Sequence, residues 1–125
     1  MYNILIVNDN SSIRILLSEI CENAGFLVTQ AVDGKDGLEK VRNGNFDAVL
    51  MDIEMPVMNG FESTRSIKTL LPFPKNKIPV IAVTGHQIND AQLSFHNVCF
   101  DAIVQKPYTI WQIVETVRGV LQKKI

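Results

Sequence analysis

The chain has 125 residues and a mass of 14.0 kDa, which is enough for one domain with one hydrophobic core and too little for a separate substrate or cap domain. Twelve Lys and Arg residues oppose 13 Asp and Glu residues, for a formal net charge of -1, and the bases are scattered, so we expect no direct nucleic-acid binding. No apolar stretch approaches the ~18 residues of a membrane span. We therefore expect a soluble, cytoplasmic protein that makes no membrane contact.

The two cysteines, Cys21 and Cys99, lie far apart in the sequence and form no Cys-x-x-Cys pair. This spacing favours reduced thiols over a disulfide or a zinc site. We expect both side chains to be buried and inert.

Short apolar runs alternate with amphipathic segments along the whole chain. Apolar runs without polar alternation are typical of strands covered on both faces, and apolar residues at helical spacing before a Gly or Pro indicate helices. In chain order, we predict a strand over 4–7, a helix capped by Asn10 or Ser11 and ended by Gly25, a strand over 26–31, a helix over 35–43, a strand over 48–51 that ends on Asp52, a helix over 61–71, a strand over 78–83, a weak helix within 88–97, a strand over 102–104 and a helix over 110–121.

The apolar spacing also predicts which face of each helix is buried. The inward residues are Ile13, Leu16, Leu17, Ile20 and Ala24 in the first helix, Leu38 and Val41 in the second, Phe61, Thr64, Ile67 and Leu71 in the third, and Ile110, Ile113, Val114, Val117 and Leu121 in the last. In the fourth helix, Ala91, Leu93 and Phe95 give only a blurred period.

Strict alternation of strand and helix predicts a single α/β domain over residues 1–125, with a parallel sheet and helices on both faces. The expected architecture is a flavodoxin-like (βα)5 doubly wound sheet with strand order 2-1-3-4-5. Such sheets bind ligands at the carboxyl ends of their strands, where the strand order reverses. Here the reversal lies between the first and third strands.

Four polar side chains follow strands that meet at this edge. Asp9 and Asp52 end the first and third strands, while Thr84 and Lys106 end the fourth and fifth. Two carboxylates roughly 5 Å apart repel by about 3 kcal/mol at an effective dielectric constant near 20, so a cation between them is favoured. An open site made of oxygen ligands suits Mg²⁺. With Mg²⁺ and Lys106 neutralising charge, Asp52 is placed as a nucleophile towards phosphorus, and Thr84 and Lys106 as donors to phosphoryl oxygens.

The sequence resembles the receiver domain of two-component response regulators over essentially its whole length. The matching segments are ILIVND at 4–9, VLMDIEMPVMNG at 49–60, IPVIAVTG at 78–85 and the Lys106-Pro107 pair. The resemblance implies that Asp52 accepts a phosphoryl group and that Asp9, Asp52 and the Glu54 backbone carbonyl bind Mg²⁺. It also implies that Thr84 and Lys106 engage the phosphoryl group together with the Ile53 and Gly85 amides, and that the Lys106-Pro107 bond is cis.

Three positions depart from the family pattern. Asn8 replaces the first member of an acidic pair. Its amide can still accept a hydrogen bond from a Mg²⁺-bound water, but one charge is lost, so we expect weaker Mg²⁺ binding with retained phosphorylation. Gly85 stands where Ala is common, which loosens the backbone there. Ile103 stands where many receivers carry the Tyr or Phe that moves with the threonine, so the predicted switch, Thr84 with Ile103, lacks an aromatic ring.

Other side chains have weaker expected roles. The resemblance implies that Glu54 and His86 border the phosphoryl site and tune the rate of its hydrolysis. His96 is expected to be a surface residue of a helix, and a metal site built on two isolated histidines is not expected. Trp111 either covers the flank of the last helix or, beside Ile103, contacts a partner.

The resemblance implies a signalling module that is not a turnover enzyme, although it promotes its own phosphorylation and dephosphorylation. A histidine kinase or a histidine phosphotransfer protein would donate the phosphoryl group, and a downstream protein or output domain would read the change. A phosphorylation-independent interaction module is the alternative favoured by Asn8 and Ile103. A small aspartate-nucleophile phosphatase is the remote alternative, because the Asp52-Ile53-Glu54 segment resembles the two-carboxylate motif of haloacid-dehalogenase-like phosphatases.

Overall fold

The computed structural model of the chain describes residues 1–85 and 87–122. Its strands are β1 (Asn3–Val7), β2 (Leu27–Ala31), β3 (Ala48–Asp52), β4 (Val80–Thr84) and β5 (Ala102–Gln105). Its helices are α1 (Ser11–Asn23), α2 (Gly34–Asn43), α3 (Gly60–Leu70), the short 3-10 helix η1 (Lys75–Lys77), α4 (Asp90–His96) and α5 (Ile110–Gln122). The order of strands and helices predicted from the sequence is confirmed, and η1 is an addition that the apolar pattern does not predict.

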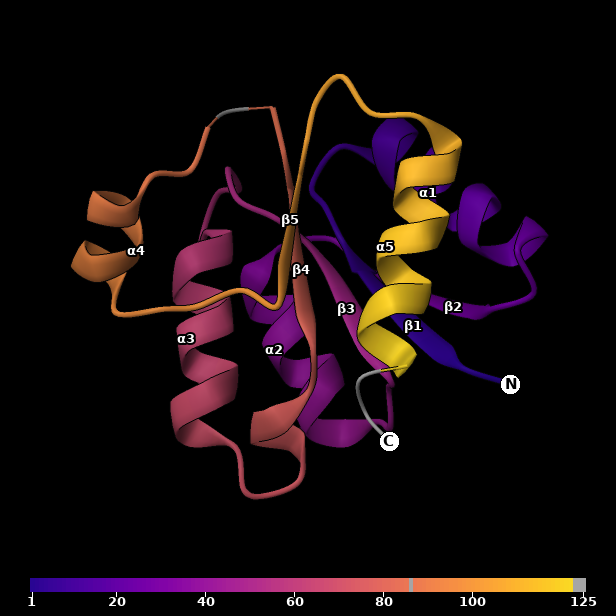
Figure 1. Ribbon diagram of the computed structural model, residues 1–125. Coiled ribbons are helices and arrows are strands. Elements are labelled where there is room, and N and C mark those ends of the chain that lie inside the picture. Colours follow the sequence, from indigo (N-terminus) through magenta and orange to yellow (C-terminus); the bar gives the residue numbers. More distant parts are fainter. Residues whose placement is uncertain (86, 123–125) are drawn as a thin grey trace.

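The five strands form one parallel sheet in the order β2-β1-β3-β4-β5, which confirms the predicted flavodoxin-like topology. Helices α1 and α5 cover one face and α2, α3 and α4 cover the other (Figure 1). Alternate residues of β1 point to opposite faces: Ile4 and Ile6 pack in the core beneath α1 and α5, whereas Leu5 and Val7 pack in the core beneath α2 and α3.

Within the described part of the chain, the helices are too short or too polar to span a bilayer.

The ends of α1 follow the predicted capping signals. The Asn10 side chain accepts a hydrogen bond from the Ile13 backbone N–H at 3.1 Å and so caps α1. Gly25 follows the end of this helix with a φ of 96°, a conformation that glycine adopts without strain. Asn59 and Glu62 form a reciprocal capping box at the start of α3. This box fixes where α3 begins after the loop that follows Asp52.

Two residues predicted to face the core are exposed instead. Leu16 on α1 is 48% exposed, whereas Leu17 and Ser18 are buried. The Ser18 hydroxyl donates to the Arg14 carbonyl at 2.7 Å. Ile110 is 64% exposed because it opens α5, one turn before that helix reaches the core at Ile113. Helix α4 buries none of its residues completely, which explains its blurred apolar period.

The expectation for the cysteines is half right. Cys21 is buried on α1, and burial, followed by the nearby charge of Glu22, raises the pKa of its thiol to about 12. It is therefore inert at neutral pH. Cys99 is exposed in the connection between α4 and β5, so the prediction that it is buried was wrong. That connection lies outside the layers of the fold, and burial there cannot be predicted from an apolar period.

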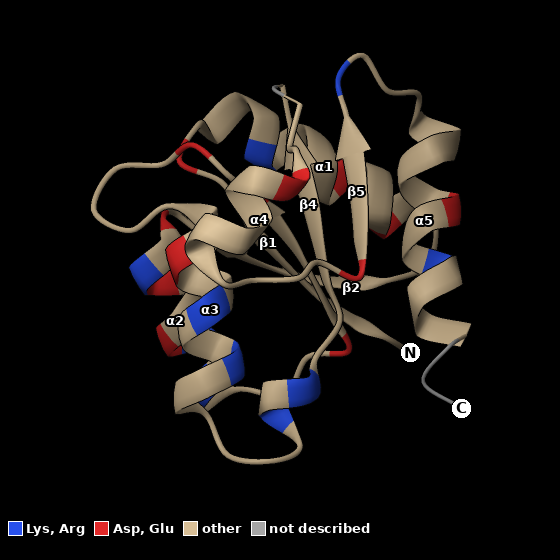
Figure 2. Cartoon of the chain, turned by 60° about the vertical axis from the view of Figure 1, so that its left-hand side comes forward, with Lys and Arg blue, Asp and Glu red and all other residues tan. Residues whose placement is uncertain are grey.

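Basic and acidic residues are spread over several elements (Figure 2). Arg65 and Lys68 lie on α3, and Lys75 and Lys77 lie on η1, directly before β4. Because η1 precedes a strand, its lysines lie at the edge where the strands begin. The carboxylates of the predicted site lie at the opposite edge.

Candidate functional site

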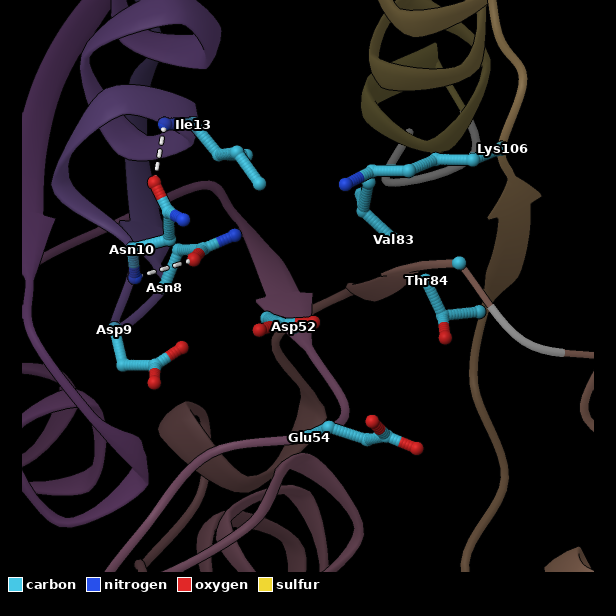
Figure 3. Close-up of a pocket in the computed structure, with 10 residues that line it drawn as sticks. Asn8, Asp9, Asn10, Ile13, Asp52, Glu54, Val83, Thr84 and Lys106 are labelled. Atoms are coloured by element: carbon cyan, nitrogen blue, oxygen red, sulfur yellow. Dashed lines mark hydrogen bonds between the residues drawn. The ribbon is translucent and has the colours of Figure 1, made fainter.

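A cavity of about 250 Å³ opens at the carboxyl ends of the strands, where the strand order reverses between β1 and β3. Its walls come from the ends of β1, β3, β4 and β5 and from the start of α1 (Figure 3). The lining residues are Asn8, Asp9, Asn10, Ile13, Asp52, Glu54, Val83, Thr84, Gly85 and Lys106. Most of the residues singled out in the sequence are thus brought together from four separate loops.

Asp52, the last residue of β3, is only partly exposed in this pocket. Its carboxylate accepts hydrogen bonds from the backbone amides of Ile53 and Glu54. Burial raises the pKa of Asp52, and the negative charge of Asp9 raises it further, while the two amides and Lys106 act in the opposite direction. The net shift is upward. The folded site therefore disfavours the ionised form of Asp52 relative to water.

Asp9 and Asn8 enter the pocket from the end of β1. Asp9 is exposed, whereas Asn8 is 4% exposed. The Asn8 side-chain oxygen accepts a hydrogen bond from the Asn10 backbone N–H at 2.9 Å. Its backbone carbonyl accepts another at 2.8 Å from the guanidinium of Arg14. Asn8 is therefore held by both its backbone and its side chain.

Thr84 and Lys106 form the opposite wall. Thr84 is 2% exposed, and its carbonyl accepts a hydrogen bond from the Lys106 backbone N–H at 2.9 Å. The Lys106-Pro107 peptide bond is cis, as expected, and the Lys106 ammonium points into the pocket (Figure 3). A Cβ added to Gly85 would meet only the Lys106 side chain at 3.8 Å. This is an ordinary contact, so the pocket has room for the Ala that is common at this position.

Other predicted residues lie partly or wholly outside the pocket. Ile53 reaches the site through its backbone amide, while its side chain is buried beneath α4. Ile103 is 44% exposed on β5 and, with the 69% exposed Trp111, lines a separate cavity of about 310 Å³. Trp111 therefore does not cover the core. His86 lies outside the described residues.

Sequence reasoning missed Asn10, Ile13 and Val83 as pocket walls and Tyr108 as a neighbour of the site. Burial raises the pKa of the Tyr108 hydroxyl, and the charge of Asp52 raises it further. The position of Tyr108, directly after the Lys106-Pro107 pair, is the signal that could have identified it.

His96 was expected to be a surface residue of a helix, and it lies at the end of α4. It is partly buried, and its ring stacks on Phe61 of α3 with centroids 4.2 Å apart and planes 2° apart. The stack attaches the last turn of α4 to α3, on a helix with few other buried contacts.

Comparison with known proteins identifies the family of this fold. Residues 4–118 match the family described as the response regulator receiver domain. The chain belongs to this family. Phosphorylation and Mg²⁺ are typical of receiver domains in two-component systems.

The receiver domain is similar to parts of longer proteins. It is 46% identical over 82 residues to the autoinducer sensor kinase/phosphatase CqsS of Vibrio cholerae, an overlap of 66% of this chain and 12% of that protein. It is 28% identical over 121 residues to the transcriptional regulatory protein PrrA of Mycobacterium tuberculosis, covering 97% of this chain and 50% of that protein. The chain thus spans from about an eighth to half of the length of these relatives.

A solved structure shares the whole receiver fold. The response regulator TrrA of Thermotoga maritima, in complex with Mg²⁺ and BeF, superposes with a TM-score of 0.83 at 30% sequence identity. The superposition covers 96% of this chain and 99% of that chain.

In the receiver domain, Val57 lies in the loop that joins Asp52 to α3, with a φ of 70° and 77% of its surface exposed. A β-branched residue is strained in this left-handed region. We expect Val57→Gly to raise the free energy of unfolding by about 1 kcal/mol in urea denaturation. Val32→Gly is the matched control at another exposed valine, and it should lower stability because it only adds entropy to the unfolded chain. Equal losses in the two variants would contradict strain at Val57.

Proposed function

We propose that this receiver domain accepts a phosphoryl group on the Asp52 carboxylate and that the modification changes how it binds a partner. The observation that carries the proposal is the grouping of Asp52 with Asp9, Thr84 and Lys106, from four strand ends, around one cavity. Asp52 is the carboxylate in the middle of this group. Burial and the negative charge of Asp9 raise its pKa, and a bound cation would oppose both effects.

The donor set fits Mg²⁺. No three His, Cys, Asp or Glu side chains of residues 1–85 and 87–122 form a group able to enclose a metal, but Mg²⁺ needs only one or two carboxylates, with water and phosphate completing its shell. Asp9, Asp52 and the Glu54 backbone carbonyl would hold the ion. When bound, Mg²⁺ would supply positive charge to the transferring phosphoryl group.

The remaining residues would assist the transfer directly. An oxygen of Asp52 attacks phosphorus, an O–P bond forms, and the N–P bond to the donor histidine breaks, so that the electron pair stays on the imidazole nitrogen. The Lys106 ammonium and the Thr84 hydroxyl would donate to the phosphoryl oxygens, with the Ile53 and Gly85 amides. Attack of water on phosphorus would later release phosphate and restore the carboxylate, at a rate that Glu54 would influence.

A phosphohistidine of a histidine kinase or a phosphotransfer protein would be the donor. Thr84 would couple phosphorylation to a change in the loops, since a ligand shifts a conformational equilibrium only by contacting the two states differently. The surface formed by Ile103 and Trp111 would present this change to a downstream partner. The domain would thus act as a switch whose chemistry is limited to its own phosphorylation and dephosphorylation.

The test is incubation of the protein with Mg²⁺ and acetyl phosphate, followed by intact mass spectrometry. We expect the mass to rise by one phosphoryl group, with the adduct located at Asp52 by borohydride reduction and peptide mapping. Absence of an adduct would contradict the proposal and favour a phosphorylation-independent interaction module. Multiple turnover of unrelated phosphomonoesters would instead favour a phosphatase.

A further inference from the structure

The side chain of Asn8 has a fixed orientation in the pocket. Its oxygen accepts the hydrogen bond from the Asn10 backbone N–H at 2.9 Å. The backbone of Asn8 is held in place by the Arg14 guanidinium at 2.8 Å and by a bond from its own N–H to the Ala31 carbonyl at 3.1 Å. Because a backbone N–H can bond only to the oxygen of an amide, the amino group must point the other way.

That other direction is the pocket. The side-chain nitrogen of Asn8 points into the cavity, in the direction of Asp52 (Figure 3). Rotating the amide by half a turn would set its amino group against the Asn10 N–H, so that two donors would face each other. The hydrogen bond of the turn would be lost, and the amino group of Asn8, a residue only 4% exposed, would face another donor. In this orientation the amino group of Asn8, a hydrogen-bond donor, faces the pocket, while its oxygen faces the Asn10 N–H.

This orientation determines what Asn8 can bind. Water molecules bound to Mg²⁺ point their hydrogens outward and need acceptors, which an amino group cannot supply. A phosphoryl oxygen is an acceptor, and an N–H donor stabilises it. On the basis of the proposed function, we propose that Asn8 is an anion-binding residue, whose amino group donates a hydrogen bond to the phosphoryl group on Asp52 rather than supporting Mg²⁺.

Two substitutions separate this role from that of a metal ligand. Asn8→Ala removes the donor without adding charge. Asn8→Asp retains an oxygen for the Asn10 N–H and turns a carboxylate oxygen towards the pocket. Asn89→Ala is the control for loss of a turn-forming Asn bond, because Asn89 caps α4 and does not line the pocket.

The first measurement is the Mg²⁺ dissociation constant of the full chain by isothermal titration calorimetry. We expect Asn8→Asp to lower it at least about tenfold, because a third carboxylate joins Asp9 and Asp52. Asn8→Ala should leave it within about threefold of wild type. A tenfold loss of Mg²⁺ affinity in Asn8→Ala would overturn the proposal, since it would show that Asn8 supports the metal.

The second measurement is beryllofluoride binding, followed by fluorine NMR at saturating Mg²⁺. We expect Asn8→Ala to weaken it about fivefold, the effect of one lost hydrogen bond, and Asn89→Ala to leave it unchanged. If wild type forms the complex and Asn8→Ala forms it equally well, the role of Asn8 is wrong while the proposed function stands. If wild type forms no complex, both fail. Circular dichroism verifies that each variant is folded.

Discussion

The Asp52→Asn variant is expected to gain no phosphoryl group from acetyl phosphate and Mg²⁺. The amide has nearly the shape of the carboxylate and keeps an oxygen for the Ile53 or Glu54 amide, but it is not a nucleophile towards phosphorus. Intact mass spectrometry after incubation measures this directly. Asp90→Asn, at an exposed carboxylate on α4, should be phosphorylated like wild type.

The same variant should also be more stable than wild type at pH 7. Burial and Asp9 raise the pKa of Asp52 above its ordinary value of 3.8, so the folded protein binds this proton more tightly than the unfolded chain does. Stability is then lost as the pH rises from the ordinary pKa through the raised one. Asp52→Asn lacks this loss, so its melting temperature should exceed that of wild type at pH 7 and approach it below the ordinary pKa.

Either of two results would contradict these expectations. An adduct that persists in Asp52→Asn would place the acceptor on another side chain, such as Asp9. A melting temperature below that of wild type at pH 7 would show that the Asp52 carboxylate is stabilised by the fold, against the direction of its pKa shift.

Gly60→Ala is expected to lower the free energy of unfolding by about 3 kcal/mol. A Cβ at Gly60 would lie 2.2 Å from the Asp52 carbonyl oxygen and 2.8 Å from the Ile53 Cα. Both are backbone atoms, which cannot rotate away as a side chain could. Either β3 or the start of α3 would have to move, and the Gly60 N–H bond to the Ile53 carbonyl, at 2.8 Å, would be strained. Urea denaturation measures the loss.

Gly119→Ala is the matched control. A Cβ there meets nothing within 4 Å, and the residue lies inside α5, so the substitution should stabilise the protein by about 0.5–1 kcal/mol. Because Gly60 packs on the backbone that carries Asp52, Gly60→Ala should also form the phosphoryl adduct more slowly. Gly60→Ala with the stability of wild type would show that β3 and α3 can separate freely at this contact.

The strand and helix order could be predicted because β1, β3 and β4 contain continuous apolar runs and because capping residues, glycines or prolines mark most helix ends. Asn10 and Gly25 act as predicted at the two ends of α1. Leu16, Ile110 and Cys99 were predicted wrongly because burial at the edge of a helix or in a connection depends on what packs there. Periodicity along one element does not contain that information.

By itself, the sequence determined the topology and which strands end in Asp9, Asp52, Thr84 and Lys106, since parallel strands bring their carboxyl ends to one edge. Only the tertiary structure decided how these groups act on one another. The upward pKa shift of Asp52 depends on its burial and on the nearby charge of Asp9. The donor that Asn8 offers the pocket depends on the backbone N–H of Asn10, because that bond decides which end of the amide faces inward. The type of a side chain fixes which donors and acceptors it has. Its hydrogen-bond partners fix which of these face the pocket.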